Sequence, residues 1–381
     1  MLKIKVIGCG AAGNKAAIEL HKKGFDLKNI TLINSTSRDI PADYKNNSII
    51  FGASNETLGG CGKERNVGKA LLLKDLKTGS IDIDSIVDPD TNVCIIVSST
   101  EGGSGSGVIP ILAKYIVEVI GVPVITCLFF GFNTDVRGMG NSVELCQEIN
   151  SNYGVIGISN AAFLDEANGN KVKAENLANE EFCKIVRILT GQDIKPGSQN
   201  IDDTDLYKLV VTPGYMFVGS CSLKGVKNVD MFNKTISTAL DNSHLIESAS
   251  KSVKRIGAIF SIPQEMSDSV DYNADVFCQR YGTPYEMFTH IQEQIEPTPS
   301  ISWIVAGMDL PLNEVKEIFE NYKKASSEVN KKKDSFFETI ASFTGNGEDA
   351  MFDMLNRSQR TPSTSKAKNS FFEEYGMDAK K

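Results

Sequence analysis

Residues 101–107 read Glu-Gly-Gly-Ser-Gly-Ser-Gly and join an apolar run at Val93–Val97 to a second apolar stretch at Val108–Ile120. A strand that ends in a glycine-rich turn before a helix presents successive backbone N–H groups at the helix N-terminus, where phosphate binds readily. Turns rarely need so many glycines, so an anion site is favoured over a simple turn. No Gly-x-x-x-x-Gly-Lys-Ser/Thr motif is present, so no P-loop lysine reaches the phosphates.

Two more glycine clusters lie in the same half of the chain. Gly8-Cys9-Gly10-Ala11-Ala12-Gly13 follows an apolar run and opens a helical pattern, which fits the Gly-x-Gly-x-x-Gly dinucleotide motif. In NAD-binding proteins this motif is accompanied by an acidic residue at the end of the second strand, where this chain has Asn34. The hypothesis of NAD binding is therefore less favoured but stays open. Gly59-Gly60-Cys61-Gly62-Lys63 is by itself more typical of a turn, but its position would place it over a terminal phosphate.

A third kind of candidate is the acidic segment Asn200-Ile201-Asp202-Asp203-Thr204-Asp205. Its acids could cap and begin a helix, which local propensity favours. Clustered carboxylates could equally polarise water or bind Mg²⁺. Nothing local decides between these interpretations.

The composition excludes several classes of function. The chain has 381 residues, 41% of them hydrophobic, and a net charge of −8, which predicts about two globular domains and argues against a surface that holds nucleic acid directly. Eight scattered cysteines predict reduced thiols, and three histidines show no metal-ligand spacing. The most apolar stretch, 115–132, contains Glu118 and Pro123, so we expect no membrane span and a cytoplasmic protein of a bacterial host.

Short apolar runs alternate with helical patterns through the first half of the chain, which predicts a parallel sheet covered on both faces. In such a sheet ligands bind at the carboxyl ends of the strands, where the glycine loops lie. A long helix is predicted over Lys171–Thr190, followed by strands at Val210–Ser222, Arg255–Ile262 and Ile301–Met308. From Pro311 a helix places Leu312, Val315, Phe319 and Tyr322 on one stripe, which we expect to pack on the body.

These segments, in this order over about residues 2–222, resemble the tubulin/FtsZ superfamily of GTPases, which polymerise into filaments. IKVIGCGAAGNKA is similar to the family's first phosphate loop, GGCGKERNVG to its γ-phosphate loop and EGGSGSG to its glycine-rich signature. The resemblance implies an α/β fold with a Rossmann-like parallel-sheet GTPase domain. The implied parts are a GTP-binding domain at 1–170, a central helix at 171–198, a smaller second domain with a co-catalytic loop at 199–310, C-terminal helices at 311–355 and a flexible basic tail at 356–381.

The resemblance also implies which residues bind GTP or GDP. Asn160 in Ile-Ser-Asn and Asn179 in Leu-Ala-Asn-Glu match the two asparagines that read the guanine. In the ribose loop FNTDVRG, Asp135 and Arg137 replace a glutamate and a more distant arginine, and Glu101 stands where the signature begins with glycine. Mg²⁺ is expected to be held through phosphate and water, with no protein metal site. The implied nucleotide-binding set is Gly10, Ala11, Ala12, Gly13, Asn14, Gly60, Gly62, Gly102, Gly103, Ser104, Gly105, Ser106, Gly107, Asp135, Asn160 and Asn179.

The segment NIDDTDLYKLVVTPGYMFVG resembles the family's co-catalytic loop and the strand after it, with Asn200, Asp202 and Asp205 at the matching positions. This resemblance favours a catalytic role over the helix cap. It implies a head-to-tail homopolymer in which one protomer binds GTP and the next inserts Asp202 and Asp205 to position and polarise the attacking water. Positioning and electrostatics would then replace a lysine or histidine base.

The C-terminal segment 356–381 has six basic and three acidic residues, so it is locally positive on an acidic protein. In this respect the chain is most like TubZ, the plasmid- and phage-encoded branch that moves DNA through a centromere-binding adaptor. We expect the tail to contact such an adaptor. A division role like that of FtsZ, a nucleotide-binding scaffold that polymerises without turnover, an NAD(P)-dependent oxidoreductase and a solvated tail without a partner stay open.

Overall fold

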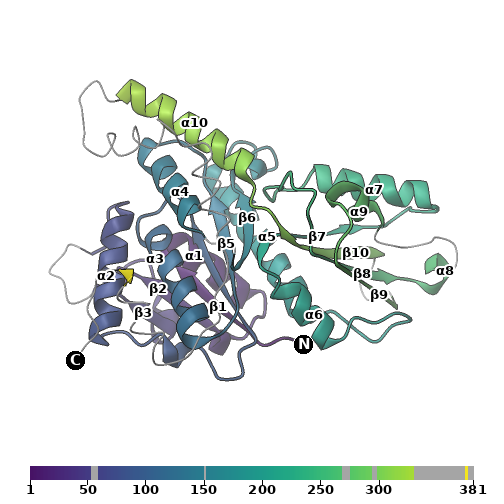
Figure 1. Cartoon of the computed structure of the whole chain (residues 1–381), viewed down its shortest axis with the longest axis horizontal. Coiled ribbons are helices and arrows are strands. Elements are labelled where there is room, and N and C mark those ends of the chain that lie inside the picture. The colour runs from purple at the N-terminus through teal and green to yellow at the C-terminus, as the bar shows by residue number, and fades with distance from the viewer. Residues whose placement is uncertain (53–58, 150–151, 268–274, 294–297, 330–373, 376–381) are drawn as a thin grey trace.

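The computed structural model describes residues 1–52, 59–149, 152–267, 275–293, 298–329 and 374–375. Ten strands of these residues form one sheet in the order β3-β2-β1-β4-β5-β6-β7-β10-β8-β9 (Figure 1). The expected α/β fold with a mainly parallel central sheet is confirmed. No helix within the described ranges has the length and apolar character needed to cross a membrane.

The first six strands of the sheet are all parallel to their neighbours. Apart from the short edge strand β3, their residues are almost all buried, which explains why they read as continuous apolar runs in the sequence. They are β1 (Ile4–Cys9), β2 (Ile30–Asn34), β3 (Ser48–Ile50), β4 (Val93–Ser99), β5 (Val124–Phe130) and β6 (Gly154–Ser159).

The strand order reverses direction between β1 and β4. Right-handed crossovers that run in opposite directions put their helices on opposite faces, so α1 covers one face and α2, α3 and α4 the other. α1 packs against α5, whereas α3 packs against both α2 and α4; α1 and α3 also meet, where Gly10 lies against Gly105 at their N-termini. The crevice at this switch point, beyond the carboxyl ends of β1 and β4, is where such sheets bind ligands. The helices are α1 (Gly10–Lys22), α2 (Arg65–Thr78), α3 (Ser104–Tyr115), α4 (Val136–Glu148) and α5 (Lys171–Thr190).

The other four strands continue the sheet with mixed directions. β7 joins β6 through only two pairs, Gly154 with Gly214 and Val155 with Tyr215, so the two halves of the sheet are joined at a narrow place. β10 lies antiparallel between β7 and β8, and β9 is the edge strand. The elements of this half are α6 (Asp203–Val210), β7 (Gly214–Ser222), α7 (Val229–Asp241), β8 (Arg255–Ile262), α8 (Gln264–Ser267), α9 (Asp275–Tyr281), β9 (Glu286–Glu293) and β10 (Ser300–Met308). Short turns of other helix types are η1 (Leu27–Asn29), η2 (Ala42–Asn47), η3 (Asp84–Ile86), η4 (Ile116–Ile120) and η5 (Ala161–Phe163).

One expectation about this half needs correction, and one strand is new. The strand expected at Val210–Ser222 begins only at Gly214, because Asp202 starts a helix that runs through Val210. The edge strand β9 was not anticipated from the sequence. In the first half, α4 begins at Val136, where Asp135 caps it.

The last described helix, α10 (Leu312–Val329), lies along α4 (Figure 1). Val315 and Tyr322 of the predicted apolar stripe are buried, so this stripe packs on the body as expected. The Tyr322 ring fits against Gly140 of α4, where a Cβ would lie 3.2 Å from the ring. Residues 330–355 and most of the predicted tail at 356–381 lie outside the described residues, but Glu374 pairs with Lys114 and Tyr375 packs against the same lysine.

Candidate functional site

The three glycine loops meet at the switch point, with their backbones in direct contact. Gly10 opens α1 with a positive φ of 69°, and a Cβ there would lie 2.9 Å from the backbone nitrogen of Gly105. A Cβ on Gly103 would lie 2.7 Å from the backbone nitrogen of Glu64. Glycine is therefore required at these positions, because the loop at 8–13 and the loop at 59–63 both pack against the loop at 101–107. In chain order these are called the first, second and third loops.

The loop at 59–63 has an unusual run of left-handed backbone. Gly59, Gly60, Gly62 and Lys63 all have positive φ, a conformation that is strained for the lysine and easy for the glycines. The Gly60 N–H donates to the carbonyl of Ser35, which follows β2, and the Ser35 hydroxyl contacts that of Ser104 at 2.7 Å. The loop is thus fixed beside the other two at the carboxyl edge of the sheet.

The helices that begin at these loops differ from others in how they start. The residues before α1, α2 and α3 make no side-chain capping hydrogen bond. In contrast, Asp135, Asn170, Asp202 and Asn228 cap α4, α5, α6 and α7 with a side-chain oxygen. The first N–H groups of a helix need an acceptor, and an anion can supply it. Three uncapped N-termini at one place therefore make a strong anion-binding geometry.

A cavity extends from this point towards α5. Its wall includes Ala11, Ala12, Glu101, Asn160 and Asn179, so it joins residues of the first and third loops to both predicted guanine-reading asparagines. Asn160 is 8% exposed, and its Oδ1 has no hydrogen-bond partner among the described residues. An unmatched buried acceptor is costly unless a ligand or water donates to it. The wall also includes Lys15 and Glu175, which no motif in the sequence indicated.

The Glu101 side chain lies at the rim of this cavity, in space that is available because Gly131 and Gly138 have no side chains. Its carboxylate lies against Gly131, and Oε1 accepts the Asn133 N–H at 3.0 Å. The pKa of Glu101 lies above its ordinary value, and burial of the carboxyl group is the largest cause. The hydrogen bond from the Asn133 N–H lowers the pKa, whereas the nearby Asp135 carboxylate raises it further. A partly buried carboxylate thus replaces the glycine with which the resembled signature begins.

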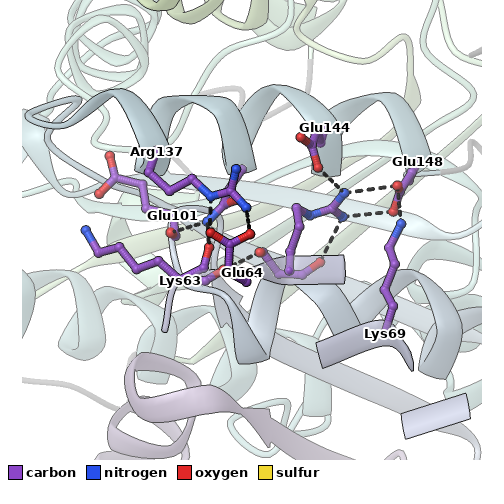
Figure 2. A network of polar contacts seen from close by, with 11 residues as sticks. Lys63, Glu64, Lys69, Glu101, Arg137, Glu144 and Glu148 are labelled. Atoms are coloured by element: carbon purple, nitrogen blue, oxygen red, sulfur yellow. Dashed lines mark hydrogen bonds and ion pairs between the residues drawn. The ribbon is translucent and has the colours of Figure 1, made fainter. Parts of the chain in front are cut away.

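Asp135 connects the segment after β5 to the loop at 59–63. It caps α4 by accepting the Gly138 N–H at 2.8 Å, and it accepts from the Lys63 ammonium at 2.7 Å. The hydrogen bond from Lys63 is the main reason why the pKa of Asp135 lies below its ordinary value. Arg137 pairs with Glu64 in the same cluster (Figure 2).

Beneath the loops lies a network around Arg65, which was not anticipated because arginine usually lies on the surface. Arg65 is 1% exposed, and its guanidinium donates to Glu144 at 3.1 Å, to Glu148 at 2.8 Å and to the Ser106 carbonyl at 3.1 Å. Figure 2 shows Glu144 and Glu148 on neighbouring turns of one helix, with Lys69 pointing towards Glu148. Burial alone would raise the pKa of Glu148, but the bonds and charge of Arg65, aided by Lys69, outweigh burial and lower it. The network fixes α2, α3 and α4 together.

The acidic segment lies at the other end of the sheet. Asp203 pairs with the amino group of Met1 at 2.6 Å, and β1 begins only three residues later, at Ile4. Since β1 has six residues and a strand rises about 3.3 Å per residue, roughly 20 Å of strand separates this end from the glycine loops. The structure therefore does not bring Asn200, Asp202 and Asp205 to the other predicted site residues of the same chain.

Asp202 and Asn200 of this segment have local structural roles. Asp202 Oδ1 accepts the Asp205 N–H at 2.8 Å and caps α6, as the simpler interpretation of the sequence had it. Asn200 exchanges two hydrogen bonds with the backbone of Gly197 and closes the loop before it. Asp202 remains exposed and Asp205 half-buried, so both carboxylates can still face a neighbouring molecule.

The end of β2 bears on the alternative of a nicotinamide cofactor. Asn34 is 2% exposed, and its side chain accepts the Ser35 N–H and donates to Asp39. It is therefore engaged in its own loop and supplies no carboxylate for a ribose hydroxyl. The oxidoreductase interpretation gains no support at this position.

Comparison with known proteins agrees with this geometry. Residues 3–168 match the model of the Tubulin/FtsZ family, GTPase domain. The cell division protein FtsZ of Aquifex aeolicus is 25% identical over 272 residues, which cover 70% of this chain and 73% of that protein.

Two solved structures show the same fold. A protofilament of CetZ2 from Haloferax volcanii, bound to GTPγS, has a TM-score of 0.70 at 16% identity and covers 86% of this chain and 99% of its own. TubZ of the Clostridium botulinum phage c-st has a TM-score of 0.65 at 13% identity and covers 86% and 98%. The chain has the tubulin/FtsZ fold, and these similarities do not favour the TubZ branch over FtsZ or CetZ.

Proposed function

We propose that this protein binds GTP, polymerises head to tail and hydrolyses GTP at the contact between protomers. The observation that carries the proposal is the convergence of three uncapped helix N-termini, α1, α2 and α3, beside a cavity with an unmatched asparagine acceptor. A nucleoside triphosphate supplies anionic oxygens for the first feature and a base with N–H donors for the second.

The proposal gives each predicted binding residue a contact with a guanine nucleotide. Asn160 would accept from a guanine N–H, and Asn179 lies on the same cavity wall. Backbone N–H groups of the loops at 10–14 and 102–107 would hold the inner phosphates, and the loop containing Gly60 and Gly62 would cover the terminal one. Mg²⁺ would neutralise phosphate charge through phosphate and water contacts. Asp135 is the candidate for a ribose hydroxyl, in exchange for its contact with Lys63.

Hydrolysis requires a second protomer in this proposal. Asp202 and Asp205 lie about one strand length from the glycine loops of their own chain, so they serve the nucleotide of a neighbour that stacks in the same orientation. There the two carboxylates would orient a water molecule and polarise it towards the terminal phosphate. Asn200 would keep their loop closed.

Sedimentation and negative-stain electron microscopy test the proposal, with GTP, GDP and a slowly hydrolysed GTP analogue, on the natural chain and on Asp205→Ala. We expect filaments with GTP that are short-lived or absent with GDP, and filaments of Asp205→Ala that persist while phosphate release falls. The absence of GTP-dependent pelleting would refute the proposal. Filaments that form without phosphate release and do not depend on Asp205 would instead indicate a scaffold. Bound NAD without filaments would indicate an oxidoreductase.

The finer proposal is that the filaments segregate plasmid or phage DNA. It is supported by the local positive charge of residues 356–381 on an acidic chain. Those residues would contact a DNA-binding adaptor, and such a contact would weaken with salt. Deletion of 356–381 should abolish salt-sensitive adaptor binding while GTP-dependent pelleting remains. Unchanged binding would leave a division role, like that of FtsZ, as the better alternative.

A further inference from the structure

His290 of the edge strand β9 contacts the acid loop, defined here as residues 195–205. Its ring is 1% exposed, and the Ile201 N–H donates to Nδ1 at 3.1 Å. Because a backbone N–H can only donate, Nδ1 must accept, and the ring proton of a neutral imidazole must then be on Nε2. Nε2 lies 2.9 Å from the carbonyl of Lys195, an acceptor for that proton. The two partners thus define one tautomer of His290.

Neighbouring residues of β9 hold the rest of the acid loop. Ile291 accepts the Ser198 N–H at 2.9 Å and donates to Gln199 at 3.1 Å, so the loop pairs with the free edge of the sheet. Gln292 Oε1 accepts the Lys195 N–H at 2.7 Å. Gly197 lies against the Ile291 carbonyl so closely that a side chain there would clash. The loop is therefore fixed along its length up to Ile201, the residue before Asp202.

The Ile201 bond is the last of these before the carboxylates. His290 makes no described contact with the glycine loops or the cavity between them, which lie at the other end of the sheet from the acid loop. A change at His290 should therefore act on the position of Asp202 and Asp205 and leave nucleotide binding by the same chain intact.

We propose that His290 is a positioning residue for hydrolysis: its Nδ1 fixes Ile201 and thereby sets where Asp202 and Asp205 meet the neighbouring protomer's nucleotide. This inference rests on the proposed function. It makes the edge strand of the second half of the sheet part of the catalytic apparatus, although His290 itself touches no substrate. A displacement of about 1 Å in such a group costs on the order of 10²-fold in rate.

Three variants separate positioning from folding. His290→Ala removes the acceptor, and we expect assembly-dependent phosphate release to fall about tenfold or more while the Kd for GTP stays at the natural value. His290→Asn places an amide oxygen where Nδ1 stood and should recover most of the rate. His21→Asn is the control, because the contacts described for His21 are with the Phe25 carbonyl and the Tyr44 ring and not with the acid loop, so turnover should stay unchanged. Loss of GTP affinity in His290→Ala, or equal rates for His290→Ala and His290→Asn, would overturn the proposal.

Mixed filaments provide a second readout. Gly105→Ala is designed to block nucleotide binding and to keep a natural acid loop. His290→Ala should bind GTP but hold the acid loop in a wrong position. The two variants are mixed. Turnover should rise above that of either variant alone, as it should when Gly105→Ala is mixed with Asp205→Ala. Recovery only with Asp205→Ala would overturn the role of His290. Natural turnover by Asp205→Ala alone would overturn the proposed function and this inference together.

Discussion

The Arg65 guanidinium donates to the Ser106 carbonyl at 3.1 Å, so a buried cation at the start of α2 holds the glycine loop that opens α3. The same guanidinium binds Glu148 of α4 through two parallel hydrogen bonds. The planar guanidinium makes four hydrogen bonds to residues of α3 and α4, one more than the three N–H donors of an ammonium group allow.

Replacing Arg65 by lysine should therefore be costly even though the charge is kept. We expect Arg65→Lys to lower the free energy of unfolding by about 2–3 kcal/mol, because breaking a buried ion pair typically costs a little more than this. Urea denaturation measures the change. Lys69→Met is the matched control on the outer side of Glu148 and should cost less than about 1 kcal/mol. Equal midpoints for Arg65→Lys and the natural chain would contradict this account.

Two glycines of one loop should respond differently to alanine. A Cβ on Gly105 would lie 2.6 Å from the Cys9 carbonyl, so Gly105→Ala must push the first and third loops apart and abolish GTP binding. A Cβ on Gly102 would meet nothing within 4 Å, so Gly102→Ala should keep the natural melting temperature. Calorimetry and nucleotide binding assays would show the contrast. A natural GTP affinity in Gly105→Ala would mean that the loops need not touch.

Glu101 should make stability depend on pH in an unusual direction. Its pKa is raised in the folded chain, so the folded state binds the proton more tightly, and stability falls as pH rises from the ordinary value of 4.5 through the raised pKa. Glu101→Gln, which keeps an acceptor for Asn133, should raise the melting temperature at neutral pH. The gain should disappear below about pH 4.5, where Glu101 is itself neutral. A gain of the same size at both pH values would exclude this explanation.

Substitution of Asp202 by asparagine and by alanine separates its role as a helix cap from its proposed role in hydrolysis. Asn is as good an N-cap as Asp, so Asp202→Asn should retain the stability of α6, whereas Asp202→Ala should lose about 1 kcal/mol. Both remove the charge, and we expect both to reduce assembly-dependent phosphate release. Thermal unfolding and phosphate release would be measured on each. Natural turnover in Asp202→Asn would assign this carboxylate to capping alone.

The glycine loops and the parallel sheet were predictable because each depends on residue type alone. Buried parallel strands read as unbroken apolar runs, and glycine after such a run marks a turn where backbones approach closely. Arg65 was not predictable, because nothing in the residues beside it indicates that two glutamates, 79 and 83 positions further along, will surround it.

The edge strand β9 was missed for a different physical reason. His290 and Gln292 occupy buried positions of this strand, where apolar residues are expected, because they bond to the acid loop. The usual alternation of apolar and polar residues is therefore hidden by polar residues on the covered side. Asp202 was ambiguous for a related reason, since one carboxylate can cap a helix and also face outward.

The separation of the glycine loops from the acid loop along β1 has a consequence for any head-to-tail chain of these protomers. Such a chain would have chemically unlike tips, one displaying an open nucleotide cavity and the other displaying the carboxylates of Asp202 and Asp205. The protomer at the first tip would have no neighbour to activate water, so its triphosphate would outlast those inside. Growth and decay would then start from different tips, and the polymer would have an inherent direction.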